Sequence, residues 1–245
     1  MPPMVDPPLV IAHAGGAALG PENTMAAINA SLAAGVEAIE IDVWRSSDGV
    51  PVLIHDRSVA RTTGGEGNVD EMPVEQLQTL DAGNGEKIPK LSDVIDVVKG
   101  KARLNIEIKQ EDIEGEIVEV VRAANAADEV WVSSFSPDVI EACKWIAPEI
   151  ERSLLFGAIK EDASLFILYN TSNLLLRSLS PSIEFVEKRP EFIELCHRRG
   201  VRCLAWTVDG EERLAAARTL EVDAVFTNEP NVALMLYRPQ AVALV

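Results

Sequence analysis

Short apolar runs alternate with longer amphipathic stretches along most of the chain. Leu9–His13 is the first apolar run, and a helical pattern follows over about Thr24–Ala34, ended by Gly35. Ala38–Val43 is the second apolar run. This alternation of strand and helix patterns favours βα units and a mostly parallel sheet.

The third apolar run, Val50–His55, begins only seven residues after Val43. A parallel crossover needs about a dozen residues or more, so this run does not fit a parallel neighbour. The intervening segment contains Asp48-Gly49, a strong hairpin signal. We therefore expect Val50–His55 to fold back antiparallel on the second strand and to bring His55 beside Asp42.

The rest of the chain predicts six further strands separated by helices. The expected strands are Arg103–Lys109, Val130–Ser134, Arg152–Phe156, Leu174–Leu179, Val201–Thr207 and Ala224–Thr227. The expected helices are Leu91–Lys99, Ile113–Ala126, Pro137–Ile146, Asp162–Tyr169, Pro190–Arg199 and Glu211–Leu220, with an irregular loop before Glu187.

Residues 57–86 are rich in Gly, Thr, Asn and Glu and contain one short amphipathic piece, Pro73–Leu80. They predict an inserted loop region after the hairpin rather than a separate domain. Without the hairpin arm the pattern gives eight strands, the number that closes a (β/α)₈ barrel. The expected fold class is therefore α/β, a single TIM barrel spanning residues 1–245.

The chain is strongly acidic, with a formal net charge of −17 and a sequence pI of about 4.6. Such a charge repels nucleic acids and anionic lipid surfaces, so no nucleic-acid partner is expected. No uncharged apolar stretch reaches the roughly 18 residues that a membrane span needs. The N-terminus lacks a signal-peptide pattern, and Cys143, Cys196 and Cys203 show no metal-ligand spacing. A reducing, cytoplasmic location is the expectation.

Charged side chains gather where the first three barrel strands end. His13 ends the first strand, and Glu40 and Asp42 lie two residues apart on the second, so their side chains share a face. Glu107 and Lys109 share a face of the third strand in the same way. Because reactive groups of such barrels gather at the C-terminal ends of the strands, we expect these side chains to converge.

Three converging carboxylates, Glu40, Asp42 and Glu107, would repel one another without a counter-ion. A divalent cation removes that conflict, and oxygen ligands favour Mg²⁺ or Ca²⁺. His13 and His55 would flank whatever the metal holds, one imidazole accepting a proton while the other donates one.

This arrangement resembles the glycerophosphodiester phosphodiesterase family over residues 9 to about 231. The matching residues are His13, Gly15, Pro21-Glu22-Asn23-Thr24, Glu40-Ile41-Asp42-Val43, Asp48-Gly49, His55-Asp56, Asn105-Ile106-Glu107-Ile108-Lys109, Ser134-Phe135, Trp206-Thr207-Val208 and Asp223. The resemblance implies the (β/α)₈ barrel, metal binding by Glu40, Asp42 and Glu107, and acid/base roles for His13 and His55. It also implies that Lys109 contacts the phosphate.

Four further residues are predicted to bind the substrate. Phe135 and Trp206 are expected to line the pocket, an expectation that the resemblance supports. Glu22 and Asn23 are included with them, and two other roles stay open for this pair. They either start the following helix or orient His13.

The sequence departs from the family pattern at two positions. Ala14 stands where an arginine usually follows the first histidine, and that arginine would be expected to hold a phosphate oxygen through two hydrogen bonds. Lys109, the metal and Arg45 would have to compensate for its loss. Asn228 stands where the family more often has aspartate.

The resemblance implies metal-dependent hydrolysis of a small glycerophosphodiester to glycerol 3-phosphate and an alcohol. Two alternatives stay open because of Ala14. The same chemistry would act on a lysophospholipid or another bulky diester, or the barrel would bind phosphorylated ligands with little or no turnover. The sequence leaves open the alcohol moiety, the oligomeric state, and which histidine is the acid and which the base.

Overall fold

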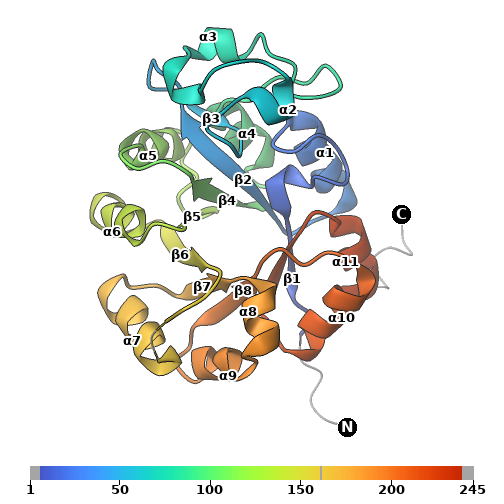
Figure 1. The fold of residues 1–245 in the computed structure, drawn as a ribbon, viewed down its shortest axis with the longest axis vertical. Coiled ribbons are helices and arrows are strands. Elements are labelled where there is room, and N and C mark those ends of the chain that lie inside the picture. The colour runs from blue at the N-terminus through green and yellow to red at the C-terminus, as the bar shows by residue number, and fades with distance from the viewer. Residues whose placement is uncertain (1–5, 161, 239–245) are drawn as a thin grey trace.

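A computed structural model describes residues 6–160 and 162–238, and eight parallel strands close into a barrel within these ranges (Figure 1). The strands are β1 (Leu9–Ala12), β2 (Ala38–Arg45), β4 (Arg103–Ile108), β5 (Val130–Ser134), β6 (Glu151–Phe156), β7 (Ser178–Pro181), β8 (Arg202–Ala205) and β9 (Ala224–Thr227). Each pairs with the next around the ring, and β1 pairs with both β2 and β9. The predicted (β/α)₈ barrel is confirmed.

Helices surround the barrel and bury the outer faces of its strands (Figure 1). They are α1 (Met25–Ala34), α4 (Leu91–Val98), α5 (Glu114–Ala123), α6 (Pro137–Ile146), α7 (Ala163–Asn173), α8 (Ile183–Lys188), α9 (Glu191–His197), α10 (Glu211–Thr219) and α11 (Pro230–Tyr237). No helix within the described ranges combines the length and the hydropathy needed to cross a bilayer.

The two faces of β2 show how the sequence orients the functional side chains. Ile39, Ile41 and Val43 belong to the main apolar core. Because side chains alternate along a strand, Glu40 and Asp42 must point to the other face, into the barrel. The apolar part of that interior is a small separate cluster of Ile11, Ala38, Trp131, Leu204, Ala224 and Phe226.

The predicted hairpin arm is present, one residue out of the expected register. β3 (Pro51–Leu53) runs antiparallel to β2, with Leu53 opposite Val43. The Ile54 N–H donates to the Asp42 carbonyl at 3.1 Å, so Ile54, and not His55, lies opposite Asp42. His55 follows one residue beyond the end of that pairing.

The insertion, residues 57–86, is more ordered than a loop. It contains α2 (Ala60–Thr63), a 3₁₀ turn η2 (Val69–Glu71) and α3 (Val74–Leu77). Its apolar side chains pack on the arm in a cluster made of Val52, Ile54, Val59, Val69, Met72, Val74, Leu77, Ala82 and Ile88. The insertion therefore has its own small core, which fixes it over the end of β2 and β3 (Figure 1).

The sequence prediction is wrong around residues 174–187. Helix α7 reaches Asn173, and the strand begins only at Ser178. The predicted irregular loop contains α8, whose N-terminus is capped by the Ser182 hydroxyl accepting from the Phe185 N–H. The predicted strand, Leu174–Leu179, begins four residues too early because the buried serines of β7 are polar: Ser180 is hydrogen-bonded to Ser153 inside the barrel.

Candidate active site

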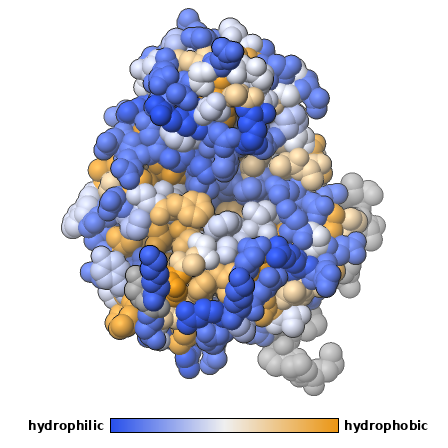
Figure 2. Space-filling view, in the orientation of Figure 1, coloured by the Kyte–Doolittle hydropathy of each residue, from blue (hydrophilic) through white to orange (hydrophobic). Residues whose placement is uncertain are grey.

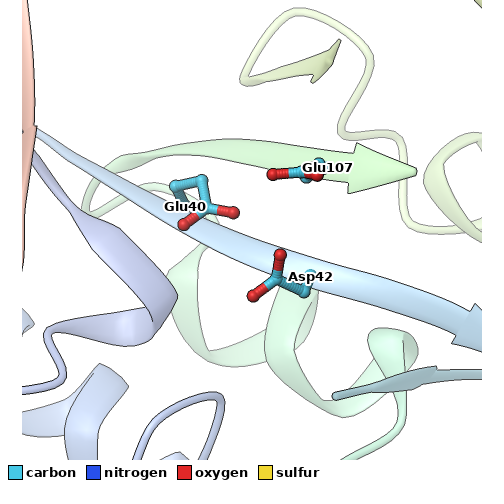
Figure 3. Close-up of side chains that lie close together, drawn as sticks. All are labelled: Glu40, Asp42 and Glu107. Atoms are coloured by element: carbon cyan, nitrogen blue, oxygen red, sulfur yellow. The ribbon is translucent and has the colours of Figure 1, made fainter. Parts of the chain in front are cut away.

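Three buried carboxylates converge on the neighbouring strands β2 and β4 (Figure 3). The two strands pair in register with Asp42 beside Glu107. One oxygen from each of Glu40, Asp42 and Glu107 lies within 4.8 Å of the others. Glu40, Asp42 and Glu107 are 2%, 0% and 8% exposed, so solvent screens the repulsion between their charges only weakly.

The electrostatics of this triad call for a cation. Burial, followed by the charges of Asp42 and Glu107, raises the pKa of Glu40, and burial and Asp42 raise the pKa of Glu107. Glu40 Oε1 and Asp42 Oδ1 are buried and accept no hydrogen bond, although the Lys109 ammonium lies 3.3 Å from Asp42 Oδ1. Oxygen atoms in this condition carry a desolvation cost that a bound cation removes. The residues present therefore fit a divalent metal with oxygen ligands.

Lys109 is the cation nearest to the triad. Its Nζ lies 2.7 Å from Glu107 Oε1 and 3.3 Å from Asp42 Oδ1. Burial alone would lower the pKa of Lys109, but the charges of Asp42 and Glu107 outweigh it and raise that pKa. Lys109 is therefore an ammonium group, and one positive charge faces three carboxylates.

Two groups from the loop after β1 fix the triad. The Ala14 N–H donates to Glu40 Oε2 at 2.7 Å. Asn23 donates to Asp42 Oδ2 at 2.8 Å and accepts from the Asp42 N–H at 3.0 Å. The side chain that caps α1 is that of Thr24, accepting from the Ala27 N–H. Asn23 therefore orients a carboxylate of the triad, and neither the helix-start role nor the orientation of His13 describes it.

His13 begins a 3₁₀ turn after β1 and is held by the residue that follows the neighbouring strand β9. Its Nδ1 lies 2.8 Å from Asn228 Oδ1, and the Asn228 amide donates to Asp209 Oδ2 at 2.7 Å. Because that second bond fixes which amide atom is the oxygen, His13 Nδ1 must carry the hydrogen. His13 Nε2 is then free and lies 3.9 Å from Glu40 Oε2.

His55 is held by a chain of charged groups. Its Nδ1 lies 2.7 Å from Asp56 Oδ1, and the Asp56 Oδ2 accepts a hydrogen bond from Arg61 Nε. The other two guanidinium nitrogens of Arg61 donate to Glu22 at 2.9 and 2.6 Å. The hydrogen bond from Arg61 lowers the pKa of Asp56. Glu22, a predicted substrate ligand, therefore pairs with Arg61 in this structure.

Two cavities meet at the histidines. The smaller, of about 190 Å³, is lined by His13, Glu40, His55, Asn105, Glu107, Lys109, Phe135, Leu155, Trp206, Thr207 and Phe226. The larger, of about 560 Å³, is lined by His13, Ala14, Ala17, Ala18, Glu22, His55, Asp56, Arg61, Asp209, Asn228 and Glu229. We call them the acidic cavity and the outer hollow. Figure 2 shows a hydrophobic patch near the middle of the viewed face and mostly hydrophilic surface on the side of the insertion.

Phe135 and Trp206 form an apolar wall of the acidic cavity. Their rings meet edge to face, with centroids 5.2 Å apart and planes at 81°. Trp206 Nε1 donates to the Ser180 carbonyl at 2.8 Å, which fixes the indole. Phe135 remains half exposed and is available to a ligand.

The structure places two residues near the site that the sequence did not indicate, and it excludes one that the sequence did. Arg61 and Asp209 reach the histidines only through Asp56 and Asn228, and no local pattern marks them. Arg45, expected to help replace the arginine missing at position 14, donates to Glu116 at 2.7 Å and to the Asp112 carbonyl instead. Arg45 lines neither cavity.

The profile of the Glycerophosphoryl diester phosphodiesterase family matches residues 13–232 of this chain. The chain belongs to this family. It is 34% identical over 245 residues to the glycerophosphodiester phosphodiesterase of Caldanaerobacter subterraneus subsp. tengcongensis, covering 94% of this chain and 98% of that protein. The expected family and enzyme class, a phosphoric diester hydrolase, are thereby confirmed.

Solved structures of phosphodiesterases share the fold. An Oleispira antarctica phosphodiesterase in complex with the product sn-glycerol-3-phosphate superposes with a TM-score of 0.84 at 30% identity, over 94% of this chain and 96% of that one. A glycerophosphodiester phosphodiesterase from Agrobacterium tumefaciens str. C58 gives a TM-score of 0.81 at 28% identity, over 92% and 98%.

Proposed function

We propose that this family member hydrolyses glycerophosphodiesters to glycerol 3-phosphate and an alcohol, using a divalent cation held by Glu40, Asp42 and Glu107. The observation that carries the proposal is that one cavity is lined by both histidines, two carboxylates of the triad and Lys109. The Oleispira antarctica relative, solved with sn-glycerol-3-phosphate, supports the same product here.

Each charged group has a definite task in this proposal. A bound Mg²⁺ or Ca²⁺ supplies positive charge that stabilises negative charge developing on a phosphoryl oxygen. Lys109 contacts a phosphate oxygen as a point charge. Phe135 and Trp206 contact the carbon skeleton of the substrate and exclude water from that side of the phosphate.

The histidines transfer the protons. His13 Nε2 accepts a proton from the attacking oxygen, which is water or the substrate's own glycerol hydroxyl. His55 Nε2 donates a proton to the oxygen of the departing alcohol. Both rings present Nε2 because Nδ1 is engaged by Asn228 in one case and by Asp56 in the other. Each such proton transfer typically contributes about 10²- to 10⁴-fold in rate.

The outer hollow supports a second substrate class, in which the alcohol is bulky, as in a lysophospholipid. The hollow adjoins both histidines, and Ala14 opens it where the family usually has an arginine. A larger leaving group on the far side of the phosphate would occupy this space. A barrel that binds phosphorylated ligands without turnover is the less favoured alternative, because it would have no use for both histidines and the complete triad.

The test compares three histidine variants with glycerophosphocholine and with a lysophospholipid, each with added Mg²⁺ or Ca²⁺. His13→Gln and His55→Gln should each lower kcat by about 10²-fold or more. His197→Gln is the matched control, because His197, the last residue of α9, pairs with Asp223 and lines neither cavity. Full activity in either of the first two variants would refute the acid/base roles. Tight binding by the wild type without turnover of either diester would favour the binding barrel.

A further inference from the structure

A continuous chain of hydrogen bonds connects the insertion with His55. Arg61 lies in α2 of the insertion, and its guanidinium bridges two carboxylates that belong to different segments. Glu22, in the loop after β1, accepts hydrogen bonds from two nitrogens of the guanidinium, and Asp56 accepts one from the third. The free oxygen of Asp56 then contacts His55 Nδ1. The geometry of the guanidinium fork fixes both carboxylates at once.

This series of hydrogen bonds determines which nitrogen of the His55 ring carries the hydrogen. An ionised carboxylate only accepts hydrogen bonds, so Asp56 requires a hydrogen on His55 Nδ1. Arg61 keeps Asp56 ionised, as the lowered pKa of Asp56 indicates. The backbone of His55 is fixed separately, because Trp44 Nε1 donates to the His55 carbonyl at 3.0 Å. Asp56 and Arg61 therefore determine the orientation and the tautomer of the imidazole ring, and not the position of the backbone.

We propose that Arg61 is a positioning residue for His55, acting with Glu22 to hold Asp56 so that the ring keeps Nδ1–H on Asp56 and turns Nε2 toward the acidic cavity. For its kinetic readout this inference rests on the proposed function. It gives the insertion a role in catalysis, because α2 supplies the residue that immobilises Asp56. Without Arg61, Glu22 and Asp56 would face each other with no cation between them, and Asp56 would turn away.

A second arginine of the insertion provides the matched control. Arg57 also pairs with two carboxylates, donating to Asp70 at 2.9 Å and to Glu71 at 3.4 Å. It is as exposed as Arg61, at 52% against 50%. None of its partners contacts a histidine. Arg57→Gln therefore removes an ion pair of the same kind without disturbing His55.

The kinetic experiment measures kcat and KM for glycerophosphocholine in five variants, one of them double. Arg61→Gln should lower kcat about 10- to 100-fold with little change in KM, the usual cost of losing a group that orients a functional side chain. Arg61→Lys should recover only part of that loss, and Arg57→Gln should keep the wild-type kcat. In the Asp56→Asn background, Arg61→Gln should add little, because both act through one contact. Multiplying effects, or an unchanged kcat in Arg61→Gln, would overturn the proposal.

A spectroscopic experiment tests the positioning without any substrate. The chain has only three histidines, so ¹⁵N-histidine spectra resolve each ring. At about pH 8, where an ordinary imidazole is neutral, His55 should show the Nδ1–H tautomer in the wild type and a mixture of tautomers in Arg61→Gln and Asp56→Asn. His197 should stay unchanged in all variants. An unaltered His55 tautomer would refute the positioning role, whereas inactive wild type with the expected tautomer change would refute only the proposed reaction.

Discussion

Asn23 makes two hydrogen bonds to Asp42, one to its carboxylate and one from its backbone N–H. Both residues are buried, at 2% and 0% exposed. One asparagine thus fixes the position of Asp42 in the strand and the orientation of its side chain. The backbone of Asn23 has a φ of 56°, a left-handed conformation that asparagine tolerates better than most residues.

Asn23→Gly should therefore weaken metal binding without straining the chain. Glycine accepts the positive φ, but it leaves the Asp42 N–H and Oδ2 without partners. We expect a loss of about 10- to 100-fold in the affinity for Mg²⁺ or Ca²⁺, measured by calorimetry. Asn84→Gly is the control, because Asn84 has the same φ of 56° on an exposed turn of the insertion. Equal metal affinity in the two variants would contradict the role of Asn23.

The convergence of the triad was predictable because it depends on two local rules. Side chains alternate along a strand, which places Glu40 with Asp42 on one face, and parallel strands bring their C-terminal ends to the same edge of a barrel. Neither rule depends on the conformation of a loop. The contact between Asn23 and Asp42 could not be predicted in this way, because it depends on how the chain turns between β1 and α1.

The register of the hairpin arm and the position of Arg61 could not be predicted from the sequence pattern. The loop between β2 and β3 holds five residues, Ser46–Val50, an odd number that moves Ile54 rather than His55 opposite Asp42. Asp48-Gly49 marks the turn without fixing its length. Arg61 comes close to Glu22 only because the insertion packs through its own apolar core.

Removing one carboxylate from the triad should stabilise the metal-free protein. The pKa of Glu40 is raised by burial and then by Asp42 and Glu107. A carboxyl group of this kind contributes its full stability below its ordinary value of 4.5 and loses it as the pH rises through the folded value. At neutral pH, metal-free Glu40→Gln should melt above the wild type, by roughly 2–4 °C for each kcal/mol gained. The difference should disappear in acid.

Metal should reverse this order. Binding of Mg²⁺ or Ca²⁺ to the folded state raises the Tm of the wild type by mass action, whereas Glu40→Gln lacks a ligand and should not respond. Glu114→Gln serves as the control, because burial also raises the pKa of Glu114, in α5 outside both cavities. It should gain stability and keep the metal response. A metal-induced rise in Tm that survives in Glu40→Gln would contradict the assignment of this ligand.

Restoring an arginine at position 14 should increase turnover of small diesters. Ala14 already has a left-handed φ of 49° and lines the outer hollow beside His13, so a longer side chain has room there without a new backbone conformation. A charge-assisted hydrogen bond to phosphate is worth about 1.5–3 kcal/mol, or about 10- to 100-fold in kcat/KM. Ala14→Gln, which adds length without charge, is the control. A gain no larger than that of glutamine would mean that the guanidinium binds the carboxylates of the hollow instead.

Asn228 and Asp209 form a hydrogen-bonded pair of one amide and one carboxylate, and exchanging the two residues tests whether both are needed. Asn228 donates to Asp209 Oδ2 while its oxygen accepts from His13. Asn228→Asp alone places two carboxylates 2.7 Å apart and should lower both stability and kcat, at a cost of about 1–3 kcal/mol in the free energy of unfolding. Asp209→Asn alone sets two amide groups against each other, or forces one to turn.

The double variant Asp209→Asn with Asn228→Asp restores one carboxylate and one amide with their positions exchanged. We expect it to recover stability and most of the lost kcat, with an interaction energy of about 0.5–3 kcal/mol from the double-mutant cycle. Denaturant unfolding and initial rates on glycerophosphocholine measure the two effects. Additive losses would show that Asn228 holds His13 independently of Asp209. Recovery would show that the position of His13 depends on the pair, because the neutral acceptor at 228 needs the anion at 209 to keep its oxygen turned toward the imidazole.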